Sequence, residues 1–149
     1  MAWTGGNFGI EMGFELVADT PDRVEVIMPI SEKVQQPFGF VHGGATIALL
    51  ETAASRAAEL RADLEKERPF GIEAHIRHWK SGREGVVRGV AEIDHEEGDK
   101  QIWNVTAYDD AGDIMSSGTF VTKIVSLERL AEKERKRAAA KRDAGENAE

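Results

Sequence analysis

The sequence predicts an α+β fold in which a curved antiparallel sheet wraps around one long central helix. Three observations predict this class. One uninterrupted helical pattern runs from about Gly43 to Leu64, and β-rich runs separated by glycine-containing turns fill most of residues 71 to 125. The chain has 149 residues, of which 41% are hydrophobic, enough for one hydrophobic core.

Residues 14 to 30 are expected to form a β-hairpin. An extended segment leads to a turn at Asp19 to Asp22, marked by Pro21. The apolar side chains Val24, Val26 and Met28 then alternate with polar ones, which is the period of a half-buried strand.

The central helix is predicted because its sequence is rich in alanine and leucine and contains no glycine or proline after Gly44. Its apolar side chains point in nearly every direction around the helix axis, so the sheet is expected to curl around it. A curled sheet around one helix is the hotdog architecture. The apolar residues are Ala45, Ile47, Ala48, Leu49, Leu50, Ala53, Ala54, Ala57 and Ala58.

Four strands are expected in the second half, over residues 71 to 80, 84 to 96, 100 to 109 and 113 to 125. The dividers SGREG, HEEGD and DDAGD each contain glycine, so we expect a four-stranded antiparallel meander to which the first hairpin adds. Residues 1–126 are predicted to be the folded domain. Residues 127–149 are predicted to be a charged tail, with a short solvated helix that frays.

Composition excludes several classes of function. A net charge of −8 and a pI near 5.1 disfavour binding to nucleic acid, which requires a basic surface. The sequence has no apolar run of bilayer-spanning length and no secretory signal at its start, so a cytoplasmic protein that does not bind membranes is expected. No cysteine is present, and the four histidines show no metal-ligand spacing, so no metal site is expected.

Glu51 is the most informative single residue, because it is a carboxylate in the middle of an apolar helical run. Burial of an ionised carboxylate costs on the order of several kcal/mol, so catalysis is one reason to keep it there. The alternative is a narrow solvated stripe that Glu51 shares with Ser55, one turn further on the same face. Ser55 either orients the carboxylate or is simply a tolerated small residue.

The helix is expected to begin at His42, Gly43 and Gly44. Free backbone N–H groups and the positive end of the helix dipole favour a developing negative charge there. Glycine also lets a substrate carbonyl approach the backbone, as an oxyanion hole requires. The alternative is an ordinary glycine turn.

Together these residues resemble the PaaI-type hotdog thioesterases, and among them most closely the glutamate-using 4-hydroxybenzoyl-CoA thioesterases. The family pattern has Gln, then His-Gly-Gly six positions later, then Glu nine positions after the His, then Thr or Ser one turn further. The spacing is met by Gln36, His42, Gly43, Gly44, Glu51 and Ser55.

The resemblance implies hydrolysis of a small acyl-CoA, with an aryl acyl group among the candidates, to the free acid and CoA. Gly43 N–H would polarise the thioester carbonyl, Gln36 would approach the thioester, and His42 would support the loop. Glu51 would act either as nucleophile through a mixed anhydride or as general base on water. No cofactor is implied beyond the CoA of the substrate, and the family builds its sites between subunits of a homodimer or homotetramer.

The resemblance also implies cations for the CoA phosphates, at Lys80, Arg83 and Lys100. Lys80 replaces a family arginine, and the family's phosphate-contacting hydroxyl residues and arginine are replaced by Gly98, Asp99 and Val125. The acyl group is expected against the helix and the facing strand. The candidate lining residues are Phe38, Phe40, Ile47, His75 and Arg77.

Two other functions stay open. A hotdog enoyl-CoA hydratase or dehydratase is disfavoured because no histidine has an aspartate five positions before it. A non-catalytic acyl-CoA-binding protein would keep the cations but would have no need of Glu51 in an apolar helix. Release of free thiol from acyl-CoA separates these functions.

Overall fold

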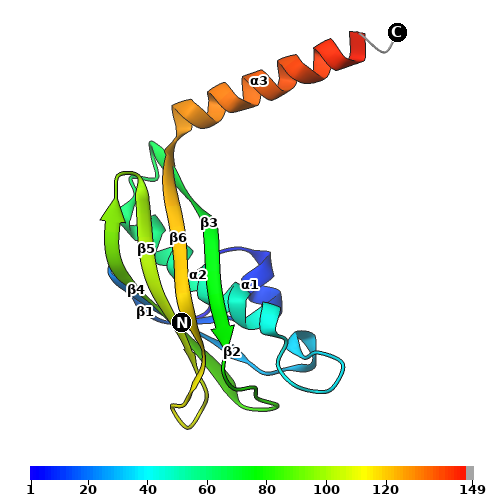
Figure 1. Cartoon of the computed structure of the whole chain (residues 1–149), viewed down its shortest axis with the longest axis vertical. Coiled ribbons are helices and arrows are strands. Elements are labelled where there is room, and N and C mark those ends of the chain that lie inside the picture. Colours follow the sequence, from blue (N-terminus) through cyan, green and yellow to red (C-terminus); the bar gives the residue numbers. More distant parts are fainter. Residues whose placement is uncertain (147–149) are drawn as a thin grey trace.

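The computed structural model describes residues 1–146, and residues 147–149 lie outside the described part. Its six strands form one curved sheet with α2 lying across one face (Figure 1). In chain order the elements are α1 (Asn7–Met12), β1 (Glu15–Asp19), β2 (Arg23–Pro29), the 3-10 turn η1 (Glu32–Val34), α2 (Gly43–Arg61), β3 (Glu67–His78), β4 (Val86–Glu97), β5 (Lys100–Tyr108), β6 (Ile114–Ser126) and α3 (Leu127–Glu146).

The predicted hairpin and central helix are both confirmed. β1 and β2 pair antiparallel with Leu16 opposite Val26. α2 ends at Arg61, three residues before the predicted end, where Ala62 adopts an extended conformation with φ −89° and ψ 151°. The α+β hotdog arrangement is therefore the observed one.

The predicted four-stranded meander is wrong in its first strand. The sheet order is β1-β2-β4-β5-β6-β3, so β3 lies at the far edge, with His78 opposite Ser116. The SGREG segment is therefore a crossover between distant strands. It runs past the start of α2, where Val41 N–H donates to Gly82 O at 2.7 Å. The remaining meander, β4-β5-β6, is as expected.

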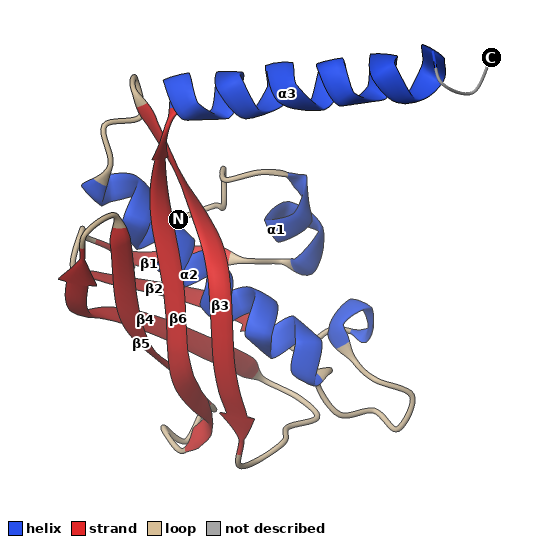
Figure 2. Cartoon of the chain, turned by 45° about the horizontal axis from the view of Figure 1, so that its top comes forward, coloured by secondary structure: helices blue, strands red, loops and turns tan. Residues whose placement is uncertain are grey.

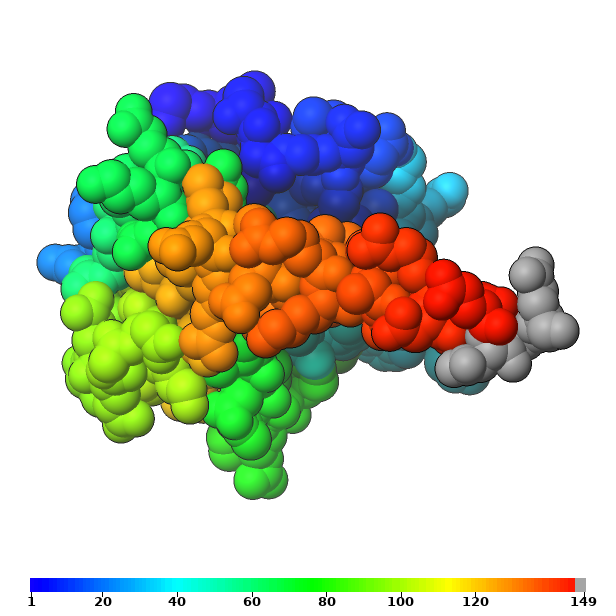
Figure 3. All heavy atoms as spheres, turned by 90° about the horizontal axis from the view of Figure 1, so that it is seen from above, coloured from blue at the N-terminus to red at the C-terminus, as the bar shows by residue number. Residues whose placement is uncertain are grey.

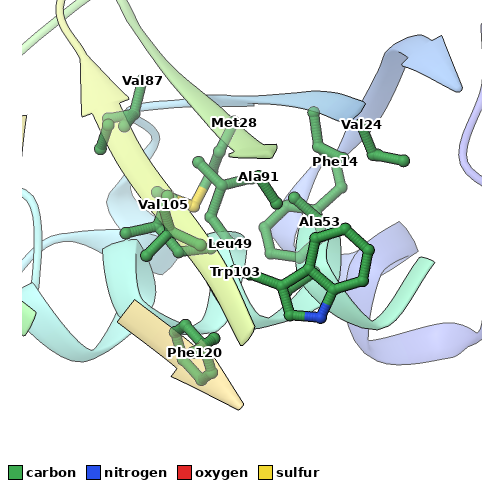
Figure 4. Packing of buried hydrophobic residues seen from close by; sticks show 14 of the residues in the cluster. Phe14, Val24, Met28, Leu49, Ala53, Val87, Ala91, Trp103, Val105 and Phe120 are labelled. Atoms are coloured by element: carbon green, nitrogen blue, oxygen red, sulfur yellow. The ribbon is translucent and has the colours of Figure 1, made fainter. Parts of the chain in front are cut away.

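The core lies between the sheet and one face of α2 (Figure 4). Leu49 and Ala53 pack toward strand side chains that include Trp103 and Val105, all of them buried. Gly89 lets β4 come close to the helix, because a side-chain carbon added there would lie 2.9 Å from Leu49 Cγ. Glycine at this position of β4 therefore makes room for the Leu49 side chain of α2.

The sheet of one chain does not enclose α2 completely, contrary to the expectation from its apolar residues. Ile47, Ala48 and Ser55 are only half-buried, and Glu51 is exposed. These residues share the side of the helix that the sheet leaves open. Glu51, the predicted catalytic carboxylate, therefore lies on the side of α2 that the sheet leaves open.

The N-terminal segment adds an element that the sequence analysis did not predict. α1 lies beside α2 (Figure 2) and ends at Gly13, whose φ of 79° is the left-handed conformation typical of a helix end. The Trp3 ring lies directly against Gly5 and Gly9, where a side chain would collide with it. Trp3 also meets Phe14 edge to face, with 6.2 Å between the ring centroids.

The solvated helix predicted after Ser126 is present, and at 20 residues it is longer than expected. None of its residues is buried, and it extends past the body of the molecule (Figure 3). Lys136 and Glu132 form the predicted ion pair at 3.1 Å. None of the helices within residues 1–146 has the length and apolar character needed to cross a bilayer.

Candidate active site

The start of α2 offers one free backbone donor. His42 is the N-cap, and its Nδ1 accepts a hydrogen bond from Gly44 N–H at 2.9 Å. Ala45 and Thr46 N–H both donate to His42 O. Among the described residues, Gly43 N–H has no acceptor. The predicted oxyanion donor is therefore available, while His42 holds the turn and uses the N–H of Gly44.

A cavity of about 330 Å³ opens at this turn and contains a second donor. Gln36 and Gly43 both line it. Gln36 Oε1 accepts from Phe38 N–H at 2.5 Å, which leaves the amide NH₂ of Gln36 unused in the loop. The Gln36 amide and Gly43 N–H are thus two donors at one cavity, as an oxyanion hole requires.

His78 lines the same cavity and was not among the predicted site residues. Its Nδ1 lies 2.6 Å from Ser116 Oγ, and Ser116 is only 1% exposed. A lone histidine near a strand end gives no sequence signal, and only the pairing of β3 with β6 places it here. The predicted acyl-site residues His75 and Arg77 lie on the opposite face of β3, because side chains alternate along a strand.

Glu51 does not line that cavity, and of the two environments predicted for it the solvated helix face is the one observed. It is exposed rather than buried, and it follows Gly43 by eight residues, about 12 Å along the helix axis at 1.5 Å per residue. A thioester carbonyl held at Gly43 N–H is therefore out of reach of Glu51 of the same chain. The physical reason is that Glu51 lies on the side of α2 left open by the sheet.

Two other cavities meet at Glu51. One, of about 290 Å³, lies between the N-terminal segment and α2 and is lined by Trp3, Phe8 and Ser55 among others. Ser55 therefore lies next to Glu51, as predicted, although no hydrogen bond joins the two side chains among the described contacts. The other, of about 220 Å³, lies between Glu51 and β3 and is lined by Gly71 and Phe120.

The predicted phosphate-binding cations differ in how free they are. Lys80 lines the Gly43 cavity, but its Nζ lies 2.6 Å from Asp109 Oδ2 and 2.9 Å from Asp113 Oδ2. The hydrogen bond to Asp109 is the largest cause that raises the pKa of Lys80, and Lys80 in turn lowers the pKa of Asp109. Lys80 is thus already neutralised by two carboxylates.

Two arginines keep their charge unpaired. The Arg83 guanidinium lies 4.0 Å from the Phe40 ring centroid, and that of Arg77 lies 4.3 Å from the Trp79 ring centroid. No carboxylate of the described residues forms a salt bridge with either arginine.

Three further candidates lie outside the cavity at the start of α2. Phe38 is 76% exposed at the tip of its loop. Lys100 is exposed and lies opposite Lys123 in the register of β5 and β6. Lys123 is eight residues along β6 from Met115 at the cavity, a distance of about 25 Å. Ile47 is half-buried beside the core on α2 and does not line this cavity.

The sequence and the fold of this chain are similar to those of known thioesterases. The family model described as the thioesterase superfamily matches residues 38–116. The 1,4-dihydroxy-2-naphthoyl-CoA hydrolase of Escherichia coli strain K12 is 34% identical over 116 residues, covering 78% of this chain and 83% of the relative. The proofreading thioesterase EntH of Cronobacter turicensis is 35% identical over 101 residues, covering 68% of this chain and 73% of the relative.

Solved structures of thioesterases have a similar fold. A mutant thioesterase from Pseudomonas aeruginosa superposes with a TM-score of 0.77 at 27% identity, over 80% of this chain and 86% of that one. A mutant thioesterase from Staphylococcus aureus gives a TM-score of 0.77 at 30% identity, over 78% of this chain and 97% of that one.

Proposed function

Since this chain belongs to the thioesterase superfamily and is a thioester hydrolase, we propose that it hydrolyses a small aryl-CoA to the free acid and CoA. The observation that supports this most strongly is the placement of two free donors, Gly43 N–H and the Gln36 amide, at one cavity. These donors would stabilise the oxyanion that forms when the thioester carbonyl is attacked. Glu51 would supply the attacking or activating carboxylate.

The proposed site is composite, because Gly43 and Glu51 of one chain are about 12 Å apart along α2. In a twofold dimer with antiparallel α2 helices whose axis passes near residue 47, midway between the two, Gly43 of one copy would lie opposite Glu51 of the other. The carbonyl oxygen would then meet Gly43 N–H of one subunit, and the carbonyl carbon would face Glu51 of its partner. The open side of α2, where Glu51 is exposed, is the side that such a dimer covers.

The edge of the sheet supports this dimer. β3 is a 12-residue edge strand, and Phe70 and Ile72 on it are 45% and 44% exposed. A long exposed edge with apolar side chains is a template for pairing with another strand. Pairing of two β3 strands would cover this edge and bring the two open α2 faces together. We propose a homodimer as the unit of activity and its pairing into a homotetramer as the larger assembly.

The cavity between the N-terminal segment and α2 suits an aromatic acyl group. Trp3 and Phe8 line it beside Glu51 and Ser55, and each of the two rings meets Phe14 edge to face. Flat aromatic walls favour an aryl ring over a flexible alkyl chain. The E. coli relative is named for an aryl substrate, 1,4-dihydroxy-2-naphthoyl-CoA, which supports the same class here.

Two chemical routes fit this arrangement. As general base, Glu51 would take a proton from water, the resulting hydroxide would add to the carbonyl carbon, and the tetrahedral oxyanion would expel the CoA thiolate. As nucleophile, Glu51 would displace the thiolate to form a mixed anhydride, which water would then hydrolyse. Both routes need the same ionised carboxylate and the same oxyanion donors. CoA would be bound as part of the substrate, with Arg77 and Arg83 as its available cations.

The test is release of free thiol from a panel of aryl-CoA and alkyl-CoA thioesters, with Glu51→Ala as the control. We expect wild-type turnover that is highest for aryl-CoA, and a loss of about 10² to 10⁴ in kcat for Glu51→Ala. CoA should still inhibit the variant competitively at wild-type strength. Hydration of an enoyl-CoA without thiol release would show a hydratase, and acyl-CoA binding without any turnover would show a binding protein. Either result overturns the proposal.

A further inference from the structure

Gly71 of β3 makes room for the Glu51 carboxylate. A side-chain carbon added at Gly71 would lie 2.5 Å from Glu51 Oε1 and 3.4 Å from Glu51 Cδ. The three atoms nearest to such a carbon all belong to the Glu51 side chain. A methyl group at residue 71 would therefore meet the carboxylate before it met anything else.

The conformation of Gly71 does not itself require glycine. Its φ is not in the positive region, unlike that of Gly13, Gly39 or Gly98. The register of β3 against β6 shifts between Gly71 and Glu73, so the strand bulges where it passes the carboxylate. Glycine at this bulge is needed for space rather than for backbone geometry.

Glu51 has no other partner that fixes it. Among the described residues no hydrogen bond and no salt bridge holds its carboxylate. A glutamate side chain without such partners keeps most of its rotamer freedom unless its surroundings restrict it. The wall formed by Gly71 and Phe120 limits where the carboxylate can lie.

We propose that Gly71 is a positioning residue that sets where the Glu51 carboxylate lies relative to the thioester. The inference rests on the proposed function, because it assigns a reactive role to Glu51. A displacement of about 1 Å in a reacting group can lower the rate by about 10²-fold. The absence of a side chain at residue 71 would then matter for turnover and not for the fold.

The first test is Gly71→Ala, which adds a single methyl group. We expect kcat to fall by about 10- to 100-fold while KM stays within about twofold, because the change acts on one reacting group. The melting temperature should stay equal or rise, because alanine is favoured over glycine within a strand and only a flexible side chain must move. Gly145→Ala is the matched control, since nothing lies within 4 Å of a carbon added there.

The second test is rescue by a shorter carboxylate. Aspartate at residue 51 is one methylene shorter and withdraws from the added methyl group. Glu51→Asp should lower kcat in the wild-type background. In the Gly71→Ala background, the fold loss in kcat caused by Glu51→Asp should be at least about tenfold smaller, which is a coupling of about 1.4 kcal/mol. Simple multiplication of the two losses would overturn the inference.

Three further outcomes are decisive. A wild-type kcat in Gly71→Ala would overturn the assignment. Loss of turnover together with loss of the dimer in a sedimentation experiment would also overturn it, because Gly71 would then serve the subunit contact. Full turnover in Glu51→Ala would instead overturn the proposed function. The two failures are therefore distinguishable.

Discussion

The His78 ring lies directly over Gly43, at the start of α2. A side-chain carbon added at Gly43 would lie 2.8 Å from His78 Nε2 and 3.3 Å from its Cδ2. The other ring nitrogen, Nδ1, is 2.6 Å from Ser116 Oγ. The ring is thus held between a buried hydroxyl and a glycine that carries the proposed oxyanion donor.

Gly43→Ala should therefore damage the oxyanion site without unfolding the helix. The added methyl group would push the His78 ring aside and would occupy space that the carbonyl needs. The backbone N–H of residue 43 is kept, but the methyl group would block the approach of the carbonyl oxygen to it, so we expect a loss as large as that for removal of one oxyanion donor, about 10² to 10³ in kcat. Steady-state kinetics with an aryl-CoA measure it, and circular dichroism should show the wild-type helix content. Unchanged kcat would show that the carbonyl binds elsewhere.

Ser116→Ala should release the His78 ring from its fixed orientation. We expect kcat to fall by about fivefold, because the lost hydrogen bond is worth on the order of 1 kcal/mol. Ser126→Ala is the matched control, since its hydroxyl accepts from Arg129 N–H at 3.2 Å at the far end of β6. Equal rates for the two variants would mean that the orientation of His78 is unimportant.

Local sequence signals predicted every strand and the two long helices but not α1, and long-range pairing decided how the strands are ordered. Alternation at Val24, Val26 and Met28 and the unbroken run after Gly44 are local, and both were correct. The pairing of β3 with β6 joins residues that are 38 positions apart at His78 and Ser116 and 59 positions apart at Glu67 and Ser126, so no turn signal could reveal it. The location of His78 depends on that pairing and was missed for the same reason.

The environment of Glu51 shows a different limit. Its apolar neighbours in sequence suggested a buried carboxylate, but in the chain it is exposed on the open side of α2. A sequence pattern cannot distinguish a helix face covered by the chain's own sheet from one left for a second copy. The alternative of a solvated stripe shared with Ser55 describes the single chain better.

The free arginines should matter more than Lys80 for CoA binding. Lys80 is already paired with Asp109 and Asp113, so Lys80→Met should change KM by less than about twofold. Arg83→Met should raise KM by about fivefold, the equivalent of about 1 kcal/mol, because it removes an unpaired charge. Initial rates over a range of acyl-CoA concentrations give both values. A larger effect for Lys80 would mean that it exchanges its carboxylates for phosphate.

Two linked hydrogen bonds between buried side chains should account for part of the free energy of unfolding. Trp103 Nε1 donates to Thr122 Oγ1 at 2.9 Å, and that hydroxyl donates to Gln101 Oε1 at 2.8 Å. Thr122→Val leaves the buried indole N–H and the amide oxygen without a partner. We expect the free energy of unfolding to fall by about 1 to 3 kcal/mol in urea titration. Thr122→Ser keeps the hydroxyl and should lose less; an equal loss would assign the effect to packing.

Mixing of two inactive variants should restore activity if each site combines Gly43 of one subunit with Glu51 of the other. A heterodimer of Glu51→Ala and Gly43→Ala chains contains one intact site and one that carries both substitutions. With equal amounts and random pairing, half of the dimers are mixed, and one site in two is intact. We therefore expect about one quarter of wild-type activity per chain after co-refolding.

A second mixture, of the wild-type chain with a chain that carries both substitutions, tests the same geometry through a loss of activity instead of a gain. In a dimer of wild-type chain with a chain carrying both substitutions, each site receives one defect and neither site works. Equal mixing then leaves about one quarter of wild-type activity, from wild-type homodimers alone, instead of the one half expected if each site belonged to a single chain. No recovery in the first mixture together with one half in the second would place Gly43 and Glu51 in the same subunit's site. The separation of Gly43 and Glu51 by about 12 Å along one helix argues instead for recovery of activity in the first mixture and one quarter of wild-type activity in the second.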